Sequence, residues 1–148
     1  MGLVLIGLSV SNVMSPAGAS SKNVTIVKIL ATPKFGKILV SAHGYALYTY
    51  SLDTKNHSNC TGSCLASWPV VKVPKGVTPS AKGVTGLGVM VRSNGTRQAT
   101  FHGKPLYLFT GDTKPGETSG QGVNNFSVAK VSPSTSTTTT VKSGGYGY

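Results

Sequence analysis

HGYALYTYSLDTK, residues 43–55, indicates a duplicated fold because a similar segment, HGKPLYLFTGDTK, stands 59 residues later at residues 102–114. Seven of the thirteen positions are identical, and Tyr50 corresponds to Phe109. Farther along, WPVVKV at residues 68–73 aligns with FSVAKV at residues 126–131. Two copies of one supersecondary unit explain this pattern most simply, and we place them at about residues 24–74 and 84–133.

Each copy has the features of β-structure. Runs at residues 24–30 and 37–40 flank a turn, and Asn94-Gly95 between two apolar runs is a hairpin signal. In the repeated segment, strand alternation places Leu47 and Tyr48 on opposite faces. No stretch of the body has a helical period. The sequence therefore predicts an all-β domain over residues 20–133, with two related halves of short antiparallel strands that form a small sandwich or barrel.

The two ends differ from this body. Residues 3–10 are apolar and are followed by small residues up to Ala19, which predicts a signal peptide over residues 1–19. An uncleaved membrane anchor is the alternative, and it would be the protein's only membrane contact. Residues 134–148 are rich in Ser, Thr, Gly and Tyr, a composition that predicts a flexible tail.

The charge balance narrows the class of partner. The chain has 14 Lys and Arg residues against 3 Asp and Glu residues, for a formal net charge of +11. The lysines are scattered singly, and Arg92 and Arg97 flank one turn, so no basic stripe suited to nucleic acid is formed. We expect anionic envelope polymers or surface proteins as partners, with self-association as a further option, and no nucleic acid.

The repeated motif is similar to that of a known protein family. The pattern Y-x-[aromatic]-x-x-D occurs twice, and CTGSC at residues 60–64 with Trp68-Pro69 follows the first copy. Together these features resemble the secreted lipoprotein-repeat family over roughly residues 35–133. The resemblance implies an exported, envelope-associated protein of unassigned biochemical function. Its motif residues in this chain are Tyr48, Tyr50, Asp53, Tyr107, Phe109 and Asp112.

Cys60 and Cys64 bracket three residues. In an exported protein such a pair is expected to form a disulfide, which in so short a loop contributes about 2 kcal/mol. A redox-active pair, or a soft-metal site completed by His57, is the alternative.

Two further pairs occupy equivalent repeat positions. Asp53 and Asp112 are expected to accept backbone N–H bonds in turns, with a cation or polar-ligand contact as the alternative. His43 and His102 precede glycines and are expected in turns. If the halves face each other, the two imidazoles would meet and ligate a transition metal or haem iron.

Aromatic residues and glycosylation sequons are two further features of the sequence. The aromatic residues are expected to pack the core, with a shelf for sugars as the alternative. Five N-x-[ST] sequons make glycosylation candidates of Asn23, Asn56, Asn59, Asn94 and Asn125.

The chain has few acids, bases and nucleophiles, and those present do not assemble a catalytic site. We expect a non-catalytic, exported cell-envelope or surface protein with a binding or structural role, and no cofactor; the alternative is a small extracytoplasmic metal- or haem-binding protein.

Overall fold

A computed structural model describes residues 22–132, with the side chains of Lys22 and Asn23 left out. The predicted signal peptide at residues 1–19 and the predicted tail at residues 134–148 lie outside the described residues. Within them, short strands dominate and helix is confined to two single turns. The elements are β1 (Lys22–Thr25), β2 (Val27–Thr32), β3 (Gly36–Ser41), β4 (Tyr48–Tyr50), α1 (Ser63–Ser67), β5 (Val77–Ser80), β6 (Leu87–Val91), β7 (Arg97–Phe101), β8 (Lys104–Pro105), η1 (Val123–Asn125) and β9 (Phe126–Val128).

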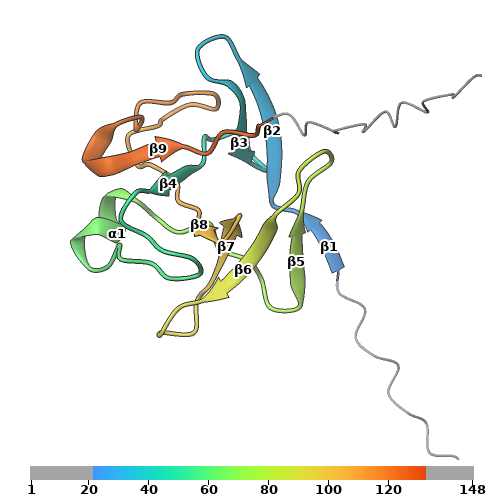
Figure 1. Ribbon diagram of the computed structural model, residues 1–148, viewed down its shortest axis with the longest axis vertical. Helices are drawn as coiled ribbons and strands as arrows, with labels where there is room; N and C mark the ends of the chain where they lie inside the picture. Colours follow the sequence, from blue (N-terminus) through green and yellow to red (C-terminus); the bar gives the residue numbers. More distant parts are fainter. Residues whose placement is uncertain (1–21, 133–148) are drawn as a thin grey trace, which may run out of the picture.

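The strands form small sheets, as Figure 1 shows: β1 with β5, β2 with β3, β4 with β9, and β6–β7–β8. This confirms the all-β prediction. The described strands do not close into a barrel, and the architecture agrees with a sandwich of two halves.

The two halves are joined at the repeated tyrosines. Tyr48 and Tyr107 exchange both backbone hydrogen bonds, each N–H donating to the other's carbonyl at 2.9 Å. Next to this pair, the two halves form equivalent backbone hydrogen bonds. Leu47 N–H donates to Leu39 O at 3.0 Å in the first half, and Leu106 N–H donates to Ala99 O at 2.9 Å in the second.

Each repeat pairs its last extended segment with the other repeat. β9, which ends the second repeat, pairs with β4 of the first. In return, residues 69–73 of the first repeat run beside β7 and β8, where Ala99 N–H donates to Val71 O at 2.8 Å and Val73 N–H donates to Arg97 O at 2.9 Å. Neither repeat therefore completes its own sheet.

The alternation predicted for the repeated segment separates two hydrophobic cores. Leu47 and Leu106 lie in one core with Val27, whereas Tyr48 and Tyr107 lie in the other. All four of these leucine and tyrosine side chains are buried. Because both faces of the central strands are covered, the repeated motif forms the middle layer of the molecule.

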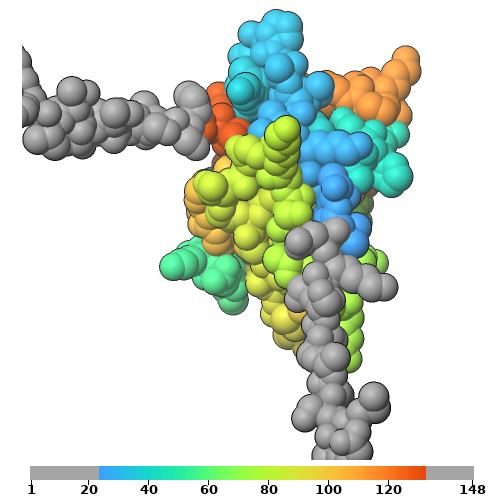
Figure 2. Space-filling model, turned by 90° about the vertical axis from the view of Figure 1, so that its right-hand side faces the viewer, coloured from blue at the N-terminus to red at the C-terminus, as the bar shows by residue number. Residues whose placement is uncertain are grey.

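Two local features differ from the sequence prediction. The run at residues 24–30 breaks at Ile26, and β1 pairs in parallel with β5 instead of continuing into the antiparallel hairpin. Figure 2 shows the blue β1 beside the green-yellow chain of β5 and β6. The turn α1 was not predicted because five residues are too few to show a helical period.

Candidate functional site

Crosswise tyrosine–aspartate pairs lie where the two repeats meet. The Tyr48 hydroxyl of the first repeat donates to Asp112 Oδ2 of the second at 2.7 Å. The Tyr107 hydroxyl of the second repeat donates to Asp53 Oδ2 of the first at 2.6 Å. Both carboxyl residues are buried, with exposed fractions of 2% for Asp53 and 7% for Asp112. The motif therefore links each repeat to the other copy through its tyrosine and its aspartate.

The second oxygen of each aspartate holds the loop that follows it. Asp53 Oδ1 accepts the backbone N–H of Asn59 at 2.6 Å, and Asp112 Oδ1 accepts the backbone N–H of Ser119 at 2.9 Å. The Ser119 hydroxyl also donates to Asp112. Buried carboxylates need such donors, since an unpaired buried charge costs several kcal/mol. In the structure these side chains face the protein interior.

Both tyrosines are held in the protonated form. Burial, and after it the hydrogen bond to Asp53, raise the pKa of Tyr107 to about 12. Burial and the bond to Asp112 likewise raise the pKa of Tyr48 above its usual value. The cause is shared: a phenolate in this place would be desolvated and would face a carboxylate.

We expect the protein to lose stability in alkali. The unfolded chain releases the phenolic protons near pH 10, whereas the folded state keeps them, so this stabilisation is complete below about pH 10 and is lost as the pH rises through about 12. For Tyr107 the loss amounts to about 2 to 3 kcal/mol. Urea unfolding across this pH range, followed together with phenolate absorbance, measures it.

The matched control is Tyr50→Phe, which removes a tyrosine that makes no described bond to an aspartate. This variant should show the same alkaline loss as the parent. If Tyr48 and Tyr107 ionise near pH 10, as free tyrosines do, while the protein stays folded, the expectation is wrong.

An arginine links one tyrosine to the disulfide loop. Ser58 Oγ lies 2.5 Å from the Tyr107 hydroxyl and accepts from Arg92 Nη1 at 2.9 Å. Arg92 also donates from Nη1 to Gln98 Oε1 at 2.8 Å and from Nη2 to Cys60 O at 2.7 Å. Cys60 and Cys64 form the predicted disulfide. Arg92 thus fixes the position of this loop, a role that the sequence alone did not reveal.

Stacked aromatic rings fill the space between the halves. Trp68 and Phe126, which are equivalent in the two repeats, stack at 3.7 Å between ring centres and 5° between planes. Phe109 covers the other side of Trp68 at 4.4 Å, and Tyr50 stacks on Phe126 at 4.4 Å. Gly120 is required beside this stack, since a Cβ there would lie 2.8 Å from Trp68 Cη2. These aromatic residues pack the core.

The repeat histidines lie in separate turns. Both imidazoles are exposed, and His102 packs on Phe101 with 4.2 Å between ring centres. Each turn contacts a different loop, because Gly116 N–H donates to the carbonyl of Gly44 and Asn56 N–H donates to that of Gly103. In residues 22–132 no group of three or more His, Cys, Asp or Glu side chains is placed to hold a metal ion. Metal or haem binding by the histidines stays a prediction.

Four of the five sequon asparagines are described with their side chains, and these lie on the surface. Asn56, Asn59, Asn94 and Asn125 are exposed, and the side chain of Asn23 is not described. Asn59 Nδ2 donates to Leu52 O at 2.5 Å, so this amide already has a backbone partner. Glycosylation at these positions stays a prediction.

Fold and site together define a duplicated all-β module in which the repeats exchange their last strands and share buried tyrosine–aspartate pairs. Residues 30–72 and 88–129 each match a family model described as a secreted repeat of unknown function, and together they cover more than half of the chain. The chain belongs to this family of secreted repeats, as the resemblance implied. Comparisons with curated proteins and with solved structures give no match. Across residues 22–132, no helix has the length and apolar character needed to cross a bilayer.

Proposed function

We propose that this exported repeat protein is a non-catalytic binding module that attaches to anionic polymers of the cell envelope or cell surface. The observation that carries the proposal is the placement of its acids. Asp53 and Asp112 are buried between the repeats, where they bind tyrosines. Surface cations therefore lack the neighbouring carboxylates that usually oppose them.

The third acid is also engaged within its own turn. Glu117 Oε2 accepts the backbone N–H groups of Thr113 at 2.6 Å and Lys114 at 2.9 Å. These bonds, that from Lys114 first, hold the pKa of this carboxyl below its usual value. Glu117 thus stays ionised as a turn residue.

Most of the described lysines, in contrast, face solvent. Where basic side chains form described hydrogen bonds, the acceptors are neutral oxygens, as for Lys28 on Ala42 O and Arg97 on Val77 O. A surface of one sign produces a long-range attraction for polyanions that salt screens. The exposed lysines are Lys28, Lys34, Lys37, Lys55, Lys72, Lys75, Lys82, Lys114 and Lys130.

A non-catalytic role fits the same geometry. Tyr48 and Tyr107 are protonated and bound, and the aspartates that would serve as acids or bases accept bonds from buried or loop donors. Groups whose bonding capacity is used within the fold are poorly placed for proton transfer to a substrate.

The test is retention on immobilised polygalacturonate, with immobilised neutral dextran as the matched control. We expect retention at low salt on the acidic polymer alone, with release as salt approaches about 1 M, where the screening length falls to about 3 Å. Replacing Lys34, Lys37, Lys75 and Lys82 together by Gln should move release to lower salt. Equal retention on dextran, or no retention at low salt, would refute the proposal.

A further inference from the structure

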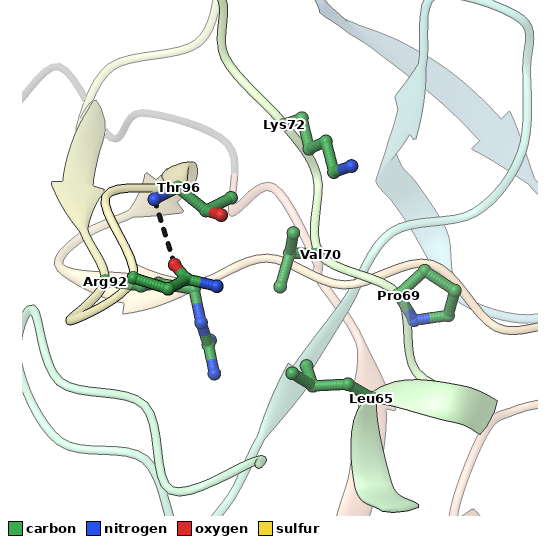
Figure 3. A pocket seen from close by; sticks show the side chains of 7 residues that line it. Leu65, Pro69, Val70, Lys72, Arg92 and Thr96 are labelled. Carbon is green, nitrogen blue, oxygen red and sulfur yellow. Dashed lines mark hydrogen bonds between the residues drawn. The ribbon is translucent and has the colours of Figure 1, made fainter. Parts of the chain in front are cut away.

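A hollow of about 310 Å³ lies between the disulfide-bonded turn and the β6–β7 hairpin (Figure 3). In Figure 3, Val70 lies in the middle, Arg92 and Thr96 lie to one side, and Leu65 and Pro69 lie below and to the other side. This volume is at the lower end of the range for small-molecule sites, about 300–1,000 Å³, and suits one small unit of a larger ligand.

Arg92 lines the hollow, and some N–H donors of its guanidinium group have no partner among the described residues. Of the five N–H donors of an arginine, two on Nη1 and one on Nη2 bind Ser58, Gln98 and Cys60. The partners are neutral oxygens, although Arg92 is half-buried. The Nε–H and one Nη2–H remain, and two guanidinium donors in one plane match the two oxygens of a carboxylate.

Two further groups add polar contacts around the apolar floor. Lys72 is exposed and supplies a second positive charge. Asn94 also lines the hollow, and because its Oδ1 accepts Thr96 N–H at 2.9 Å, its Nδ2 remains as a donor. The hollow therefore combines two cations, uncharged donors and an apolar surface.

The other repeat differs at this position. Lys130 stands where Lys72 does, but it lies over the ring of Phe35, 5.5 Å from its centre. Phe35 comes from the β2–β3 turn and packs against the core. The equivalent β6–β7 hairpin brings Arg92 and Thr96 in place of an aromatic ring, so the two copies have diverged in chemistry here.

We propose that this hollow binds a carboxylate-bearing sugar unit, of the uronic acid kind, within an anionic polysaccharide. The inference rests on the proposed function and names the site at which the polymer is held. The carboxylate binds Arg92, and Lys72, on the other side of Val70, attracts it by its charge. The C–H face of the sugar ring packs on Val70 and Pro69, and ring hydroxyls bond to Thr96.

Calorimetric titration of the whole protein with trigalacturonic acid tests the site, with neutral maltotriose and inorganic phosphate as comparison ligands. The variants are Lys72→Gln and Lys130→Gln, which remove the same charge from equivalent positions of the two repeats. We expect Lys72→Gln to weaken trigalacturonate binding by about fivefold or more, and Lys130→Gln by less than about twofold. Arg92→Lys, checked by thermal unfolding because Arg92 also holds the disulfide loop, should weaken binding by about tenfold.

The outcomes separate the site from the general function. If polygalacturonate is retained but Lys72→Gln and Lys130→Gln weaken binding equally, the site is wrong and the proposed function stands. If neither the polymer nor the trisaccharide binds, both are wrong. Maltotriose or inorganic phosphate binding as tightly as trigalacturonic acid would overturn the assignment of an acidic sugar.

Discussion

A fragment of residues 22–80, which contains the first repeat, is expected to be unfolded as a monomer. It keeps the β2–β3 hairpin and the β1–β5 pair but loses β9, the partner of β4, and it leaves residues 69–73 without β7. Trp68 also loses Phe126, and Tyr48 loses Asp112. Two-stranded pairings that lack further strands and a shared core are at best marginally stable in water.

Circular dichroism and amide proton dispersion measure this, at concentrations where sedimentation shows a monomer. Residues 22–132 serve as the folded reference, and a fragment of residues 81–132 is expected to be unfolded as well. Mixing the two fragments should restore dispersed spectra, because each supplies the strand that the other lacks. A cooperative melt of the monomeric first fragment would contradict the exchange of strands.

Trp68→Ala is expected to lower the free energy of unfolding by about 3 to 5 kcal/mol. Trp68 is 1% exposed and is stacked between Phe126 and Phe109. Its removal leaves a cavity at the contact of the two halves, and both repeats lose packing. Since small domains are stable by about 5 to 15 kcal/mol, this variant is expected to be close to unfolding. Urea unfolding measures the change.

Trp68→Phe is the matched control. The smaller ring keeps the stack and gives the first repeat the residue that the second has at position 126. It also removes the buried indole Nε1, which has no hydrogen-bond partner among the described residues. We expect a loss of less than about 1.5 kcal/mol. A loss below about 1 kcal/mol for Trp68→Ala would show that the stack does not hold the halves together.

The duplication and the two-faced central strands were predictable from sequence. The similarity of residues 43–55 to residues 102–114 shows two copies, and alternation there assigns Leu47 and Tyr48 to opposite faces. The cysteine pair was predictable as well, because two cysteines four positions apart in an exported chain favour a disulfide.

The exchange between copies was not predictable, because repetition makes the possible partners alike. Residues 69–73 and 126–131 have similar sequences, so either segment suits the sheet of either repeat. The same ambiguity applies to the tyrosines and aspartates, whose spacing permits pairs within a repeat or between repeats. Their three-dimensional arrangement decides this, and it places Tyr48 on Asp112.

The hollow beside Arg92 also escaped prediction. It depends on the β6–β7 hairpin and on the chain from Leu65 to Lys72. The β2–β3 turn of the first copy carries Phe35, whereas the β6–β7 hairpin brings Arg92. Ser58, which links Arg92 to Tyr107, is one serine among many in a Ser-rich chain. Contacts between distant loops leave no periodic signal in a single sequence.

The central claim is that the buried pairs join the two repeats, and a double-mutant cycle on unfolding free energy tests it directly. Tyr48→Phe and Asp112→Ala, made singly and together, are predicted to be coupled by about 1 to 3 kcal/mol. Tyr48→Phe and Asp53→Ala, in the same repeat, are predicted to be additive within about 0.5 kcal/mol. Coupling of Tyr48 to Asp53 with none to Asp112 would contradict the account.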